Sequence, residues 1–170
     1  PSISTVLKKF EIVKSKLFKE GLIDDSLRKK LPKYPHSIGI LTSVPSSALA
    51  DMLRTSKERW PLTKLQIIPV PVQGNNENKL QSILSKLKIN KLKLQALIIA
   101  RGGGSREDLM LFDSEIIARE IATFPIPVIT GIGHEDDLTV ADLVSDHRSA
   151  TPTAAIVDLL PSREIEKNKF

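Results

Sequence analysis

The 170-residue chain carries 25 Lys and Arg, 20 Asp and Glu and no cysteine, for a formal net charge of +5. The absence of cysteine excludes disulfides and thiolate metal sites, and no run of about 18 apolar residues occurs that would span a membrane. The length suits one domain that buries its own core. Since no secretory leader pattern is visible, we expect a cytoplasmic protein.

The charge is unevenly distributed along the chain. Residues 1–36 hold nine Lys and Arg against four Asp and Glu, whereas residues 101–146 hold three Arg against ten Asp and Glu. An acidic half does not attract a polyanion by itself. If the substrate is nucleic acid, we expect it to be bound by the basic N-terminal arm, by the five lysines between residues 79 and 93, or by parts outside this chain.

The N-terminal arm is predicted to be helical. Residues 3–18 place apolar side chains at spacings of three and four, as in an amphipathic helix. A second short helix is expected at residues 24–31, and Pro32 and Pro35 then form a stiff link. We therefore interpret residues 1–35 as a basic helical arm and linker.

Strand and helix patterns alternate through the rest of the chain. The predicted strands are 38–42, 65–70, 94–100 and 126–130, and the predicted helices are 45–60, 78–87, 113–124, 138–144 and one from Thr151 as N-cap to about Pro161. This alternation predicts an α/β fold for residues 36–160, with a mainly parallel sheet of about four or more strands and helices on both faces. Pro69 places the second strand near an edge, or makes it short.

Two of these helices carry a predicted inward face. The side chains expected to face the sheet are Leu49, Met52 and Leu53 in the first helix, and Ile116, Ile117 and Ile121 in the third.

A glycine-rich loop follows the buried, branched run that ends at Ala100. The loop consists of Arg101, Gly102, Gly103, Gly104 and Ser105. Glycines leave backbone N–H groups uncovered for an anion, and Ser105 with Asp108 fits a capping box that would open a helix at the same point. Because Arg101 adds a permanent planar cation, the loop is a candidate phosphate site; a simple tight turn is the alternative.

Two common phosphate motifs are absent. A P-loop requires a Gly-Lys pair, which does not occur in the sequence. The dinucleotide fingerprint requires a third glycine where Glu107 stands.

The second candidate stretch runs from Gly131 to Asp137. His134 is followed by three carboxylates, an arrangement typical of a general acid or base, with Asp137 suited to orient the ring. His134 and Asp137 could instead hold a divalent cation with Asp51, or His134 could cap the next helix. A lone Asp such as Asp51 is usually a solvated helix residue, and only its nearness to these loops makes it a candidate.

The candidate loops are expected to share one edge of the sheet, because they all follow the carboxyl ends of predicted strands, where ligands of parallel sheets bind. These loops are 42–47, 73–74, 101–105 and 131–137. His36 and His147 lie outside this set and look ordinary.

Five segments, in order, resemble the large subunit of exodeoxyribonuclease VII. They are Ile38–Ser43, Pro71–Gly74, Arg101–Leu109, Gly133–Asp137 and Ala150–Ala155. The resemblance implies hydrolysis of single-stranded DNA from either end to short oligonucleotides, with several copies of a small helical partner subunit. It also implies essential roles for the positions that match Asp51, Arg101, His134 and Asp137, and makes residues 161–170 the start of a C-terminal helical region.

The expected mechanism is in-line attack of water on a phosphodiester. Arg101 and the N–H groups of Gly103 and Gly104 would stabilise the phosphate charge, and His134 would transfer the proton. No cofactor is strictly implied, and the requirement for Mg²⁺ is left open, with Asp51 and Asp137 as candidate ligands. The alternatives are a non-catalytic phosphate- or nucleotide-binding domain and a structural hub for the small subunit.

Overall fold

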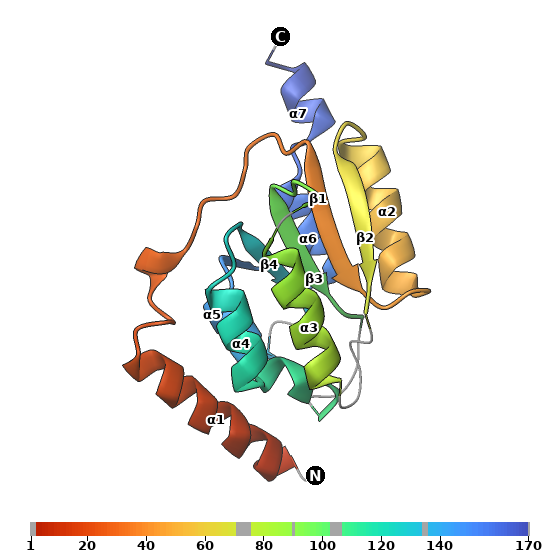
Figure 1. Cartoon of the computed structure of the whole chain (residues 1–170). Helices are drawn as coiled ribbons and strands as arrows, with labels where there is room; N and C mark the ends of the chain where they lie inside the picture. The colour runs from red at the N-terminus through yellow and green to blue at the C-terminus, as the bar shows by residue number, and fades with distance from the viewer. Residues whose placement is uncertain (1–2, 71–75, 90, 103–106, 134–135, 170) are drawn as a thin grey trace.

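The computed structural model describes residues 3–70, 76–89, 91–102, 107–133 and 136–169, and Figure 1 shows their arrangement. The elements are α1 (Ile3–Lys19), η1 (Asp25–Leu27), β1 (Ser37–Thr42), α2 (Ser47–Arg59), β2 (Lys64–Pro69), α3 (Glu77–Leu87), β3 (Ala96–Ala100), η2 (Glu107–Asp113), α4 (Glu115–Ala122), β4 (Val128–Gly131), α5 (Val140–Val144), β5 (His147–Arg148), α6 (Pro152–Leu159) and α7 (Arg163–Lys167).

The strands form one sheet in the order β2-β1-β3-β4-β5, and every neighbouring pair is parallel. The predicted parallel α/β fold is confirmed, and β2 lies at an edge, as Pro69 suggested. Strand β5 was missed, since His147 and Arg148 lie outside every predicted strand. Two residues are too short to show the alternation by which strands are recognised in a sequence.

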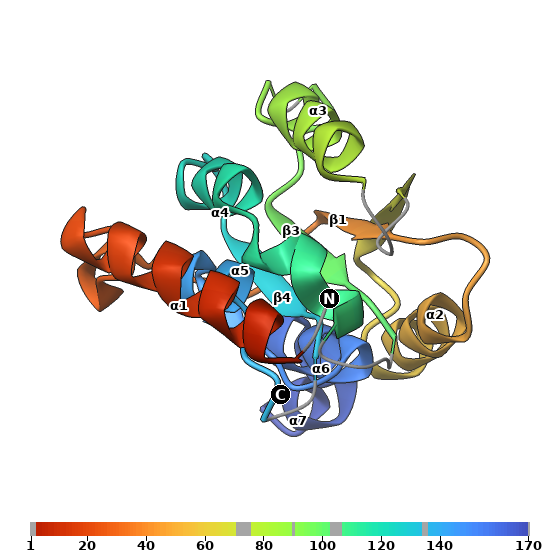
Figure 2. The same ribbon diagram turned by 90° about the horizontal axis from the view of Figure 1, so that it is seen from below.

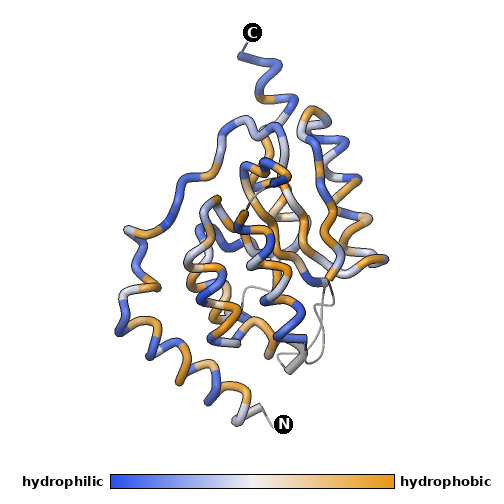
Figure 3. The backbone as a smooth tube through the Cα atoms, viewed as in Figure 1, coloured by the Kyte–Doolittle hydropathy of each residue, from blue (hydrophilic) through white to orange (hydrophobic). Residues whose placement is uncertain are grey.

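Each face of the sheet has its own hydrophobic core. Alternation along the strands sends Leu41, Leu97, Ile99 and Val128 to one face, and Ile38, Ile40, Ile98 and Ile129 to the other. Residues of α1, α3, α4, α5 and η2 cover the first face, and α2 and α6 cover the second. Figure 2 shows these two helix layers, and Figure 3 shows that the strands between them are largely hydrophobic. The prediction of helices on both faces is therefore confirmed.

Helix α1 forms as predicted and packs on the α/β domain. Its inward side chains Val6, Phe10, Val13 and Leu17 are buried. At its C-terminal end, Arg119 of α4 donates to Glu20 at 2.6 Å and to Glu115 at 2.8 Å. The arm thus shares the core of the sheet's first face, while the division at residue 35 stays a prediction about domain organisation.

The prediction of a second arm helix at residues 24–31 is wrong. Only the short 3₁₀ turn η1 forms, capped by the Asp24 side chain, which accepts from the Ser26 N–H at 2.9 Å. The chain then becomes extended at Arg28, whose guanidinium donates to the carbonyls of Leu143 at 2.6 Å and Val144 at 2.8 Å. Arg28 satisfies the C-terminal carbonyls of α5, and this tertiary contact replaces the predicted helix.

The inward faces of two helices are rotated relative to the prediction. Leu53 is 38% exposed and Ile116 is 39% exposed, so neither faces the sheet as expected. In α2 the buried stripe follows Leu49, Met52 and Ser56. Leu53 is about 40° from Leu49 but about 100° from Met52 around the helix, so it lies at the margin of this stripe, where the spacing alone does not decide burial. None of the helices in the described part of the chain is long and apolar enough to cross a bilayer.

Candidate active site

The carboxyl ends of the four predicted strands lie side by side along one edge of the sheet, the edge formed by strand ends and not by an outer strand. Thr42 is level with Pro69, and Ala100 is level with Gly131, in parallel pairs that run through β1 and β3. The segments that follow these residues therefore leave the sheet together, as predicted. Of the candidates in them, Gly103, Gly104, Ser105 and His134, with the loop at 73–74, lie outside the described residues.

The strand order marks one point on this edge. Strands β1 and β3 are neighbours, but the chain leaves β1 towards α2 on one face and leaves β3 towards η2 and α4 on the other. Open parallel sheets bind ligands at such a point, because the two connections diverge there and leave the strand ends uncovered. Gly102 lies there: a Cβ on it would be 3.6 Å from the Cβ of Ala48, in the first turn of α2.

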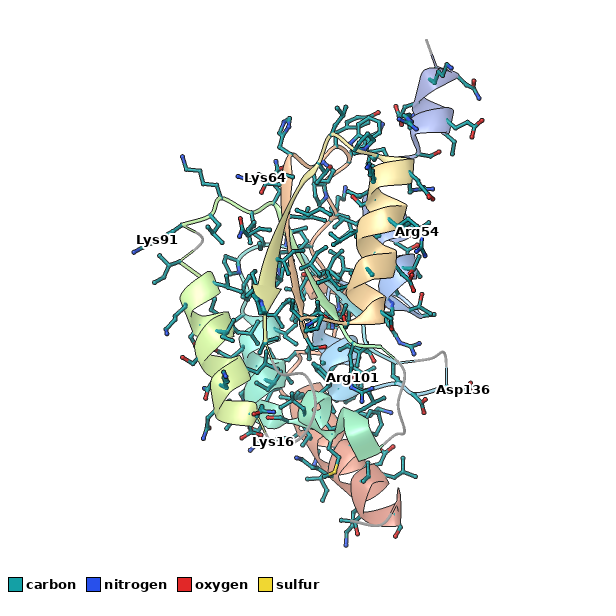
Figure 4. The ribbon with its side chains drawn as sticks, turned by 90° about the vertical axis from the view of Figure 1, so that its right-hand side faces the viewer. Lys16, Arg54, Lys64, Lys91, Arg101 and Asp136 are labelled. Carbon is teal, nitrogen blue, oxygen red and sulfur yellow. The ribbon has the colours of Figure 1, made fainter. Side chains whose placement is uncertain are left out.

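Arg101 is the cation at this point. It is only 3% exposed, its backbone N–H donates to the carbonyl of Gly131 at 3.1 Å, and its Nη1 donates to the carbonyl of Gly102 at 2.9 Å. Figure 4 shows Arg101 at the end of the sheet where the strand arrows terminate, opposite the end that carries Lys64. A buried guanidinium attracts a phosphate more strongly than one in water does, since screening is weaker.

Asp51 lies on the α2 side of the same point. It is one turn after Ala48 and so shares the helix face that approaches Gly102. Its Oδ1 accepts from Nη2 of Arg54 at 2.6 Å, and its side chain is 49% exposed. Sequence analysis missed this ion pair, although the spacing of three residues on a helix would have revealed it.

Asp137 is held against Gly133 by close packing. A Cβ on Gly133 would lie 2.9 Å from the carbonyl oxygen of Asp137, 3.1 Å from its Cβ and 3.1 Å from Cδ1 of Leu109 in η2. Gly133 and Asp137 thus lie close together, next to Leu109 of η2. Asp137 is partly buried and Asp136 is exposed, and the pairing of Asp137 with His134 stays a prediction.

The segment after the glycine loop differs from the prediction. We expected a capped α-helix there, but Glu107–Asp113 is the 3₁₀ helix η2, and α4 begins only at Glu115 with Ser114 as its N-cap. Leu109 and Phe112, three residues apart, are both buried, which a turn with three residues allows. Helix α4 therefore does not begin at the glycine loop, and its N-terminus is not the one expected to face a phosphate there.

A buried polar cluster supports the second candidate segment and was missed by sequence analysis. Asp142 of α5 accepts hydrogen bonds from Thr130 of β4 and from Thr139, the N-cap of α5. Thr139 and Asp142 form a complete capping box. The spacing Thr-x-x-Asp was visible in the sequence and would have located the start of this helix.

His147 has a structural environment, as expected. Its Nε2 lies 2.9 Å from Oδ2 of Asp158, to which Ser149 also donates at 2.6 Å, so β5 is fastened to α6. Burial acts to raise the pKa of Asp158, but the hydrogen bonds from Ser149 and His147 outweigh it and hold the pKa below its ordinary value.

The described residues contain no group of three or more His, Asp or Glu side chains arranged to hold a metal ion. Asp51 and Asp137 stay candidate ligands on sequence grounds alone.

The comparisons with known proteins decide the family. The family model described as "Exonuclease VII, large subunit" matches residues 22–170. The chain belongs to this family. The match includes both the Arg101 segment and the Gly133–Asp137 segment, in agreement with the resemblance seen in the sequence.

Exonuclease VII large subunits from several bacteria are similar to this chain. The identity is 60% over 166 residues to the exodeoxyribonuclease 7 large subunit of Synechococcus sp. (strain CC9311), covering 96% of this chain and 43% of the relative. For the same protein of Parasynechococcus marenigrum it is 58% over 167 residues, covering 97% and 43%. For that of Campylobacter hominis it is 49% over 154 residues, covering 90% and 39%. The chain thus spans less than half the length of these relatives.

Proposed function

We propose that this chain is the catalytic part of an exonuclease that hydrolyses phosphodiester bonds of single-stranded DNA from either end, releasing short oligonucleotides. Membership of the exonuclease VII large-subunit family supports the reaction class. The structural observation that supports the proposal is the position of Arg101, a residue only 3% exposed, at the point of the sheet where parallel sheets bind ligands.

The proposed chemistry is in-line attack of water on a phosphodiester. Arg101 binds the phosphate and stabilises the charge that develops on its oxygens, together with the backbone N–H groups of the glycine loop. His134 transfers the proton and Asp137 orients its ring. Asp51 positions the water or a cation.

The requirement for a metal divides this scheme into two versions. With a Mg²⁺ ion, Asp51 and Asp137 would serve as oxygen ligands, which suits a hard cation. Without one, Arg101 supplies the positive charge and the carboxylates act only as orienting groups. The assay below separates the two.

The partners are proposed on the same basis. A protein named "large subunit" implies a second, smaller one, and we propose a helical small subunit in several copies. Residues 161–170 would lead into the region that holds it, residues 36–160 would form the catalytic domain, and residues 1–35 its basic arm. We also propose that the protein acts in the cytoplasm.

The test uses this chain in place of the matching segment of the Synechococcus large subunit, assembled with the small subunit of that organism. A single-stranded oligonucleotide labelled at one or the other end is incubated in EDTA and then in Mg²⁺, beside a duplex of the same sequence. We expect degradation of the single strand from either label and an intact duplex. Cleavage in EDTA supports the metal-free version, and cleavage only with Mg²⁺ makes Asp51 and Asp137 metal ligands.

A His134→Ala variant separates catalysis from binding. The nuclease proposal expects lost hydrolysis with retained fold and retained oligonucleotide binding, whereas a phosphate-binding domain would not need His134. No hydrolysis by the wild-type assembly under either condition would contradict the proposed function.

A further inference from the structure

A buried carboxylate outside the candidate catalytic set holds the two ends of the segment that carries Asp137. The side chain of Asp142, in the first turn of α5, is 0% exposed. A carboxylate removed from water is stable only if its oxygens accept hydrogen bonds or face a cation. The partners of Asp142 therefore indicate what it does.

The groups that donate hydrogen bonds to its carboxylate come from the two ends of one segment, Thr130 and Thr139. Oδ1 accepts from Oγ1 of Thr130 at 2.7 Å. Oδ2 accepts from both the backbone N–H and Oγ1 of Thr139, each at 2.9 Å, and Nε of Arg148 is 3.6 Å away. Thr130 and Thr139 are both 0% exposed, so these bonds are shielded from competing water.

The carboxylate of Asp142 therefore bridges Thr130 and Thr139, the two ends of the segment between them. Thr130 belongs to β4 and Thr139 caps α5, so one carboxylate fixes both the departure of the chain from the sheet and its return. The segment carries Asp137, and it begins at Gly131, whose carbonyl accepts from the N–H of Arg101 at 3.1 Å.

A second buried carboxylate fastens the other candidate segment to the same place. Asp113, at the end of η2, is 0% exposed, and its Oδ1 accepts from the N–H of Val140 at 3.1 Å. The first turn of α5 is therefore the point at which the connection after β3 and the connection after β4 are joined.

We propose that Asp142 is a positioning residue of the proposed hydrolysis: through Thr130 and Thr139 it sets where Asp137 stands relative to Arg101. This inference rests on the proposed function. Asp142 touches no reacting atom and acts by holding the ends of the segment, so its loss should lower kcat far more than it raises KM.

The test removes the Thr130 hydroxyl, which also lies 3.4 Å from Oγ of Ser145, and keeps the side-chain shape. Thr130→Val deletes the hydroxyl that donates to Asp142, and Thr130→Ser retains it. The matched control is Thr63→Val. Thr63 is also buried, at 6% exposure, and its hydroxyl donates to the Pro35 carbonyl at 2.6 Å. It directly precedes β2 and so lies at the amino end of the strands, away from the candidate site. All three are made in the assembly described above.

Two measurements decide the outcome. In steady-state hydrolysis of the labelled single strand, Thr130→Val should lower kcat at least about tenfold with KM nearly unchanged, while Thr130→Ser and Thr63→Val stay close to wild type. In amide hydrogen exchange followed by mass spectrometry, peptides from residues 131–140 should exchange faster in Thr130→Val and not in Thr63→Val.

The results separate this inference from the proposed function. Unchanged exchange in Thr130→Val, or an equal loss of kcat in Thr130→Val and Thr63→Val, overturns the positioning role even though the wild type hydrolyses DNA. If the wild type hydrolyses nothing, the proposed function is wrong and so is a role of Asp142 in it, whatever the exchange data show.

Discussion

Gly133 is the position where one added methyl group should disturb the candidate site most directly. A Cβ there would lie 2.9 Å from the carbonyl oxygen of Asp137, closer than real Cβ contacts come, and 3.1 Å from Cδ1 of Leu109. The carbonyl belongs to the backbone and cannot rotate away, so the segment itself must shift. Overpacking of this kind costs about 1–3 kcal/mol.

Gly102 provides the control for Gly133→Ala. Among the described residues, a Cβ on Gly102 would meet only the Cβ of Ala48 at 3.6 Å, an ordinary contact, and neither glycine has a positive φ. Both substitutions reduce the entropy of the unfolded chain equally, by about 0.4–1 kcal/mol. The difference between the variants therefore measures the clash alone.

Thermal and urea unfolding of the two variants is the assay. With about 2–4 °C per kcal/mol for a chain of this size, Gly133→Ala should melt about 2–12 °C below Gly102→Ala. Gly102→Ala should melt at or slightly above the wild type. Equal melting temperatures of the two variants would show that the close approach of Gly133 to Asp137 does not exist in solution.

Three further predictions concern the site and the arm. Arg101→Lys keeps the charge but loses the planar fork, and we expect kcat/KM for single-stranded DNA to fall about 100-fold with an unchanged circular dichroism spectrum. Hydrogen bonds from Arg119, and then from Lys16 of α1, hold the pKa of Glu115 below its ordinary value of 4.5. These contacts therefore stabilise the fold above pH 4.5, and this stabilisation is lost as the pH falls through the lower folded-state pKa. Amide exchange in α1 should then rise in acid before that of the strands. Leu17→Ala should cost about 2–5 kcal/mol in urea unfolding because Leu17 is 0% exposed, whereas its neighbour Phe18, 70% exposed, should tolerate the same change within about 0.5 kcal/mol.

The elements that the sequence predicts well have long, regular patterns. Helix α1 follows from apolar spacings of three and four, and β1 and β3 follow from runs of branched residues that are buried on both faces. The start of α6 follows from local chemistry: Thr151 accepts from the N–H of Ala154 at 3.0 Å, with Pro152 in the first turn. In each case local preference and tertiary packing favour the same structure.

The predictions fail where a tertiary contact decides the local structure. Residues 24–31 have a helical pattern, yet Arg28 is drawn to the carbonyls at the end of α5 and the chain extends. The segment of η2 was expected to open an α-helix, but Leu109 packs at Gly133 and Asp113 bonds to Val140, which favours the tighter turn. Contacts between residues so far apart in sequence leave no periodic trace.

The sequence predicts that the candidate site lies at the carboxyl ends of the strands. The position of the site along these strand ends follows only from the strand order. The chain order of the loops does not reveal that β1 and β3 are neighbours, and this adjacency is what brings Gly102 against the first turn of α2. The roles of Asp51, Arg101, His134 and Asp137 stay predictions, to be tested by the substitutions above.

The charge distribution indicates how such a site would select its substrate. The edge that carries Arg101 also carries the partly or fully exposed carboxylates Asp51 and Asp136, whereas the exposed Lys64 and Lys91 lie towards the opposite end of the sheet (Figure 4). Since Asp51 is paired with Arg54, this edge offers a polyanion little attraction at long range, and the buried guanidinium attracts a phosphate only at short range. Affinity for DNA would then come from surfaces away from this edge, and the edge would act on the one phosphodiester delivered to Arg101. Raising the salt concentration should therefore weaken DNA binding in the assembly more than it slows hydrolysis of DNA already bound.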